Sequence, residues 1–216
     1  MPLCPMRQML DQARKGRYGV GAYNVNNMEQ IQAIIAAAGE TKSPVIIQAS
    51  RGALEYTNLI YLKHLMAAAV EEHPELPIVL HLDHGPNFKM CQEAIALGFT
   101  SVMIDGSIDY DTKTPEGKHP ARSFEDNLRV TKEVVDYAHQ FGVSVEGELG
   151  TLGGIEDDTH TDKVLLTDPN AIHWVGSALI EVDFTGHLHD EHVPSVRAWL
   201  EARPARRLLR RVSLQV

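Results

Sequence analysis

The sequence has little of what marks secreted, membrane-spanning or nucleic-acid-binding proteins. Its two cysteines, Cys4 and Cys91, lie far apart and form no CxxC pair, so a reducing compartment fits better than a disulfide scaffold. It contains no apolar run of about 18 residues, and its first residues are too interrupted for a signal peptide. The formal charge of −9 argues against a general nucleic-acid binder, which needs clustered cations. We therefore expect a cytoplasmic protein without membrane or nucleic-acid partners.

Short apolar segments alternate with helix-like stretches through the first 150 residues. Ile31, Ile34, Ile35 and Ala38 share one helical face, and similar spacing recurs near residues 62–69, 91–98 and 128–138. Such alternation predicts parallel strands joined by helical crossovers. The expected strands are Gly19–Val25, Pro44–Ser50, Ile78–His84, Ser101–Ser107 and Val143–Gly150.

This pattern fits either a (β/α)8 TIM barrel or a doubly wound sheet. No GxGxxG motif follows the first strand, which makes dinucleotide binding less favoured. Polar residues also collect at the carboxyl ends of the expected strands, where barrel enzymes keep their chemistry. The α/β barrel is therefore our predicted fold.

The barrel pattern stops before the end of the chain. Ala178–Phe184 is a candidate sixth strand, but residues 197–211 hold six arginines and no lysine. We expect a C-terminally incomplete barrel of about six βα units over residues 1–172 and a divergent tail over 173–216. Truncation or a shifted reading frame near residue 172 would explain this change.

The candidate chemistry begins with Asp83 and His84, at the end of the third expected strand. An imidazole is a good zinc ligand, and a neighbouring carboxylate can accept or donate a proton. Taken alone, the pair is more simply explained by a helix cap and a loop histidine. Asp105 and Glu148 end the next two strands, and three consecutive strand ends with potential ligands favour a catalytic-type metal site.

Several motifs, in order, closely resemble class II aldolases, especially fructose-bisphosphate aldolase. They are GAYNVNNMEQIQAI, SPVIIQAS, LHLDHG, GFTSVMIDGS and VSVEGELGTLGG, and they cover roughly residues 1–170. The resemblance implies a zinc-dependent TIM-barrel lyase that reversibly cleaves fructose 1,6-bisphosphate into dihydroxyacetone phosphate and glyceraldehyde 3-phosphate. Its partners would be phosphorylated ketose and triose phosphates, and it implies a homo-oligomer.

The resemblance also assigns roles to individual residues. Asp83 matches the family's proton donor and His84 its first catalytic zinc ligand. Asp105 and Glu148 match ligands of a second or alternative divalent metal position. The remaining matches are Asn26 and Ser50 for substrate binding, Ser50 as a contact to glyceraldehyde 3-phosphate, and Glu156 as an acid/base residue on a mobile loop.

The later family motifs are not matched in the same way. Counting from Ala178 places His187 where the family's second zinc histidine would lie, but Glu181 and Asp183 replace apolar or small residues. Nothing resembles the third histidine or the later phosphate-binding loops. The open alternatives are a tagatose-bisphosphate aldolase, a catalytically inactive aldolase fragment and, least favoured, an acidic binding module without chemistry.

Overall fold

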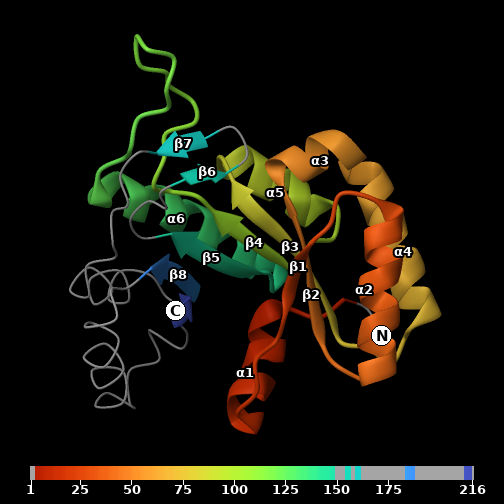
Figure 1. Cartoon of the computed structure of the whole chain (residues 1–216). Coiled ribbons are helices and arrows are strands. Elements are labelled where there is room, and N and C mark those ends of the chain that lie inside the picture. The colour runs from red at the N-terminus through yellow and green to blue at the C-terminus, as the bar shows by residue number, and fades with distance from the viewer. Residues whose placement is uncertain (1–2, 149–153, 157–158, 162–182, 188–211, 216) are drawn as a thin grey trace. The chain divides into compact units, whose positions relative to one another are not determined.

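The computed structural model describes residues 3–148, 154–156, 159–161, 183–187 and 212–215. The helices are α1 (Met6–Gly16), α2 (Met28–Thr41), α3 (Arg51–Thr57), α4 (Leu59–Glu72), α5 (Phe88–Ala96) and α6 (Phe124–Ala138), with a short 3-10 turn at His139–Phe141. The strands are β1 (Ala22–Asn24), β2 (Val45–Ser50), β3 (Ile78–Gly85), β4 (Ser101–Ile104), β5 (Ser144–Glu148), β6 (Gly154–Glu156), β7 (Thr159–Thr161), β8 (Asp183–His187) and β9 (Val212–Gln215). Up to β5 the strands are separated by helices, and α3 and α4 together separate β2 from β3, as drawn in Figure 1.

The chain divides into two compact units. The first unit comprises residues 1–85, 89–103 and 138–144, and the second comprises residues 86–88, 104–137 and 145–216. In the first unit the strand order is β1-β2-β3-β4, with β1, β2 and β3 parallel. Spatial order therefore equals chain order, as in a barrel, whereas a doubly wound sheet reverses direction part-way.

The core of the first unit lies on its two central strands. Ile47, Val79 and Leu82 are fully buried, and β3 is buried along most of its length. Such continuous apolar runs are expected where a parallel strand is covered on both faces. On one side α2, which begins at the Asn27 cap, buries Ile31 and packs against β2 and α4.

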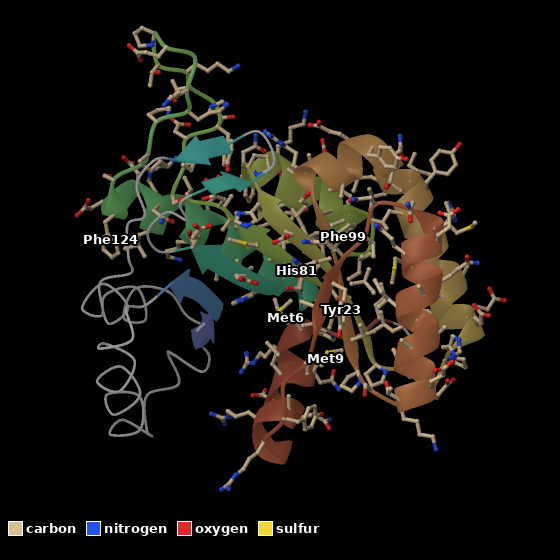
Figure 2. All side chains as sticks on the ribbon, in the orientation of Figure 1. Met6, Met9, Tyr23, His81, Phe99 and Phe124 are labelled. Atoms are coloured by element: carbon tan, nitrogen blue, oxygen red, sulfur yellow. The ribbon has the colours of Figure 1, made fainter. Side chains whose placement is uncertain are left out.

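Helix α1 covers the amino ends of the strands in the first unit. The backbone N–H of Cys4 donates to Ile78 O at 2.9 Å, at the start of β3. The backbone N–H of Arg7 donates to Ser144 Oγ at 3.0 Å, at the start of β5. Met9 packs with the buried cluster that also contains Met6, Ile46 and Val79 (Figure 2). Closing this end leaves the carboxyl ends of the strands for chemistry.

The second unit adds parallel strands beyond β5. In it the order is β5-β8-β9, with Glu148 paired to Thr185 and Phe184 paired to Val212. The predicted sixth strand, Ala178–Phe184, overlaps β8 (Asp183–His187) at Asp183 and Phe184, and residues 178–182 lie outside the described residues. Strand β9 was not expected from the sequence, because the arginine-rich pattern before it gave no strand signal.

Most predicted helices and strands are confirmed, with differences in detail. The expected strand Ser101–Ser107 is wrong at its carboxyl end, because β4 stops at Ile104. There the Asp105 carboxylate accepts hydrogen bonds from the backbone N–H and hydroxyl of Ser107, which turns the chain. Helices α1 and α3 and the antiparallel pair β6–β7 were not predicted either. Among the helices that the structure describes, none combines the length and apolar character needed to cross a lipid bilayer.

His81 is a buried polar residue in the middle of β3. Its Nδ1 lies 2.9 Å from Ser101 Oγ, and that hydroxyl also lies 3.7 Å from the Met6 sulfur. Burial, with a smaller contribution from the nearby charge of His84, lowers the pKa of His81 to about 3. The imidazole is therefore neutral in the folded protein at neutral pH.

Replacing Met9 with alanine should destabilise the first unit. The change deletes a buried side chain between α1 and the sheet, so we expect the free energy of unfolding to fall by about 2–4 kcal/mol. Urea denaturation measures it. Met28→Ala, at a side chain that is 45% exposed, is the matched control and should change stability far less. Equal effects of the two substitutions would contradict the assigned role of α1.

Neutral His81 should make stability depend on pH. Between about pH 6.5 and the folded pKa of about 3, the unfolded chain binds a proton that the folded chain does not. Unfolding free energy should therefore fall as pH falls through this window, by up to ~1.4 kcal/mol per pH unit from this group. His81→Gln should remove that part of the slope in denaturation curves at several pH values. The exposed control His64→Gln should keep it, and an unchanged slope in His81→Gln would refute the prediction.

Candidate functional site

The carboxyl end of β3 presents Asp83 and His84 side by side. Asp83 pairs in register with Ser50 of β2, and Gln48 Nε2 donates a 2.9 Å hydrogen bond to Asp83 Oδ2. His84 Nε2 lies 3.9 Å from Asp83 Oδ1. Both side chains are partly exposed, at 15% for Asp83 and 22% for His84, so they are held by the protein and can still be reached. The structure thus places the Asp83 carboxylate and the His84 imidazole near each other at the end of β3.

The backbone at His84 explains why both side chains can serve one site. In a regular strand, consecutive side chains point to opposite faces. His84 has φ of +49°, a left-handed conformation that non-glycine residues adopt at a cost of about 1–3 kcal/mol. Gly85 follows, and a Cβ there would lie 2.6 Å from Met103 O, so only glycine permits this close approach. Strain of this kind concentrates at functional sites.

Ser50 and Asn26 lie at the ends of the two preceding strands. Ser50 closes β2 and caps α3, its hydroxyl accepting a 3.3 Å hydrogen bond from Ala53 N–H. Asn26 follows β1, and its N–H donates to Gln30 Oε1 at 2.7 Å while its carbonyl accepts from the Thr57 hydroxyl. The predicted substrate-binding residues therefore stand at the same end of the sheet as Asp83, within the first unit.

In the second unit, Asp105 follows β4 and is buried. Its Oδ1 accepts hydrogen bonds from Ser107 N–H at 3.1 Å and from the Ser107 hydroxyl at 2.6 Å. Its Oδ2 accepts a 2.6 Å hydrogen bond from the Tyr110 hydroxyl. All three of these donors lie on the segment that follows β4.

Glu148 ends β5 close to Asp105. The two side chains each place a carboxylate oxygen within 4.8 Å of the other, and both residues are buried. Asn127 of α6 donates to the Glu148 carbonyl at 2.7 Å, which ties the helix to the strand end. A Cβ at Gly106 would lie 2.0 Å from Asn127 Oδ1, so this approach requires glycine.

Two buried carboxylates at this separation constrain the chemistry of the site. Like charges in a poorly solvated place repel, and the arrangement is stabilised by a shared proton or a nearby cation. Carboxylate oxygens bind divalent metal ions, and an imidazole nitrogen adds affinity for zinc and its neighbours in the first transition row. The carboxylates of Asp105 and Glu148 in the second unit, and the imidazole of His84 in the first, are each of a type that binds such an ion.

The two remaining predicted residues, Glu156 and His187, lie on strands for which only the backbone pairing is described. Glu156 is the last residue of β6, paired with Thr159 of β7. His187 is the last residue of β8, two positions beyond Thr185, which pairs with Glu148. His187 is thus at the carboxyl end of the strand adjacent to β5, where the prediction requires it, and its role as a ligand stays a prediction.

The sequence reasoning missed the residues that hold the candidate side chains. Gln48 lies two residues before Ser50 and so shares its face of β2, a signal that could have been used. Ser107 follows Asp105 by two residues, a spacing common in turns. Tyr110 and Asn127 carried no comparable signal, because Tyr110 lies in a segment without a regular repeat, five residues after Asp105, and Asn127 lies on α6.

Comparison with known proteins identifies the family. The sequence model of the protein family described as class-II fructose-bisphosphate aldolase matches residues 4–183 of this chain. A fructose-bisphosphate aldolase from Giardia intestinalis is 59% identical over 169 residues, which are 78% of this chain and 48% of that protein. One from a Nostoc species is 50% identical over 194 residues, covering 84% of this chain and 52% of that protein. The chain thus spans about half the length of these relatives.

Solved structures agree with the sequence comparison. The YdjI aldolase from Escherichia coli K12 superposes with a TM-score of 0.73 at 29% identity, over 91% of this chain and 68% of that one. The fold is accordingly an α/β fold of the TIM-barrel type, as predicted. With its family model, its relatives and its fold in agreement, this chain belongs to the class-II fructose-bisphosphate aldolase family.

Proposed function

We propose that this chain uses a divalent metal ion, zinc by family, in the reversible cleavage of fructose 1,6-bisphosphate into dihydroxyacetone phosphate and glyceraldehyde 3-phosphate. The observation that carries the proposal is the pairing of Asp83 with His84 at the end of β3, in a chain of this aldolase family. It joins a carboxylate that can move a proton to an imidazole that can bind a metal.

In this proposal His84, Asp105 and Glu148 hold the metal. An imidazole and two carboxylates form a mixed nitrogen and oxygen donor set, which suits a catalytic site with positions left for substrate. The closeness of the Asp105 and Glu148 carboxylates supports it, since a cation would offset their repulsion. When a divalent ion is bound, it supplies Lewis acidity towards a ketose carbonyl oxygen.

Asp83 then moves the proton that bond cleavage requires. In the cleavage direction its carboxylate takes the proton of the hydroxyl on the carbon that becomes the aldehyde. The adjacent carbon–carbon bond breaks, and its electron pair stays with the fragment that carries the ketose carbonyl. That fragment later gains a proton, for which we propose Glu156. Gln48 holds one oxygen of Asp83, which keeps the carboxylate oriented for transfer.

Other residues are proposed to bind the substrate and complete the metal site. Ser50 lies beside Asp83 on the neighbouring strand, which supports a contact to the triose end of the substrate. Asn26 follows β1 at the same end of the sheet, and we retain it as a second substrate contact. His187, last in β8, is retained as a further metal ligand.

We also propose a domain organisation, an oligomeric state and a cellular location for the protein. Residues 173–216 remain a proposed divergent tail after a partial barrel at 1–172. We further expect a homo-oligomer. We also expect a cytoplasmic location, with which the two free cysteines, Cys4 and Cys91, are consistent.

A coupled cleavage assay with fructose and tagatose 1,6-bisphosphates, with and without a chelator, tests the activity. Metal binding without cleavage of either sugar would instead support the inactive fragment.

Asp83→Asn should separate proton transfer from metal binding. The amide keeps the side-chain shape but cannot take the hydroxyl proton, so kcat should fall by about 100-fold or more while metal content stays unchanged. The coupled assay and elemental analysis measure the two quantities. Asp136→Asn, at an exposed residue of α6, is the control. Retained turnover in Asp83→Asn would remove Asp83 from its role.

His84→Ala should instead lose metal and activity together. Removing the imidazole deletes the nitrogen donor, so zinc content after dialysis should fall well below that of the unaltered chain. His64→Ala, at an exposed residue of α4, should keep its zinc. Full zinc occupancy in His84→Ala would overturn the ligand assignment.

A further inference from the structure

The segment between β4 and α6 folds back on itself as an arm closed by one β-bridge. Ile108 bridges to Ala121 in antiparallel fashion, and the N–H of Arg122 donates to Ser107 O at 2.7 Å. At the far end the chain turns at Gly117, whose φ is +80°. Figure 1 shows this arm as the green trace that leads into α6. Its two ends are therefore held together immediately beyond Asp105.

Arg122 closes the base of the arm. Its guanidinium donates to Ile108 O and, at 3.1 Å, to Asp109 Oδ1. The Thr112 hydroxyl donates to the other oxygen of Asp109. The hydrogen bond from Thr112, followed by that from the Asp111 backbone and the charge of Arg122, lowers the pKa of Asp109. Asp109 thus stays ionised and keeps Arg122 in place.

His119 packs against Tyr110 across the arm. The two rings have centroids 5.4 Å apart and are tilted by 48°. His119 Nδ1 lies 2.8 Å from Thr112 O and 3.3 Å from Asp109 O, so this nitrogen carries the proton and donates to carbonyls. The ring that contacts Tyr110 is therefore itself held by the backbone of the opposite side of the arm.

Tyr110 connects this arm to the Asp105 carboxylate. The two hydrogen bonds from Ser107 to Oδ1 use both lone pairs of that oxygen. A cation that binds Asp105 would therefore bind Oδ2, the oxygen to which the Tyr110 hydroxyl donates at 2.6 Å. Ser107 is two residues from Asp105 and needs only the local turn, whereas Tyr110 reaches Oδ2 through the folded arm.

We propose that Tyr110 is a positioning residue, which orients Oδ2 of Asp105 towards a divalent metal ion, and that the arm closed by Arg122 and His119 holds Tyr110 in place. The inference rests on the proposed function, because it takes Asp105 as a metal ligand. Hydrogen bonds of this kind fix the direction of a ligand oxygen and moderate its charge. The arm then sets metal affinity without itself binding the metal.

The test is Zn²⁺ binding by the full chain, measured by competition with a chromogenic chelator at constant pH. Tyr110→Phe removes the hydroxyl and keeps the ring against His119, so the dissociation constant should rise about 10-fold. Tyr56→Phe makes the same chemical change at a side chain that is 77% exposed and should leave the constant unchanged. Circular dichroism and urea denaturation establish that both variants are folded.

A second variant separates positioning from packing. Tyr110→Ala removes both hydroxyl and ring, so if Tyr110 serves only to pack the arm, phenylalanine should restore zinc binding that alanine loses. If the hydroxyl positions Asp105, phenylalanine should remain weakened. His119→Gln should weaken binding in the same direction, because it removes the ring that Tyr110 contacts.

The outcomes distinguish this inference from the proposed function. Zinc binding by the unaltered chain with an unchanged constant in Tyr110→Phe would overturn the role of Tyr110 and leave the metal site standing. Absence of zinc binding by the unaltered chain would overturn both. A selective loss of affinity in Tyr110→Phe, with Tyr56→Phe unaffected, is the result we expect.

Discussion

The burial of two carboxylates close together is the constraint on which this structure depends. Asp105 and Glu148 would repel each other in a dry site, so each needs donors that face it. The hydroxyls of Ser107 and Tyr110 meet this need for Asp105, and they require a turn at the end of β4 and a folded arm. Asn127 ties α6 to the Glu148 backbone. The turn and arm after β4 and helix α6 therefore support the ends of the two strands that carry these side chains.

In the first unit, stabilising contacts lie at the amino ends of the strands and the candidate site residues lie at their carboxyl ends. Helix α1 covers the amino ends through hydrogen bonds and through the cluster around Met9. The carboxyl ends carry Ser50, Asp83 and His84. At His84 the chain accepts a left-handed conformation, which frees the side chain from strict alternation. This division is the usual one in barrel enzymes, where one face supports folding and the other supports catalysis.

The sequence predicts those site residues that lie at the ends of short apolar strands. A run such as Ile78–Leu82, between turn signals, predicts a buried strand, and the polar residues that follow it, Asp83 and His84, are then expected at its end. The sequence does not predict site residues on segments that lack a strong hydrophobic periodicity. The arm that places Tyr110 has no helical or strand repeat, and β9 follows an arginine-rich stretch.

The sequence by itself determined the alternation of helices and strands, the parallel sheet and the residue types at the strand ends, because these follow from local hydrophobic period and chain direction. Tertiary structure alone decided which donors meet those residues. Gln48 reaches Asp83 through the register of β2 on β3, and Tyr110 meets Asp105 at the base of the arm where Arg122 meets Asp109. Gln48 and Asp83 lie 35 residues apart, and the five residues from Asp105 to Tyr110 follow no regular repeat, so only the folded chain defines these contacts.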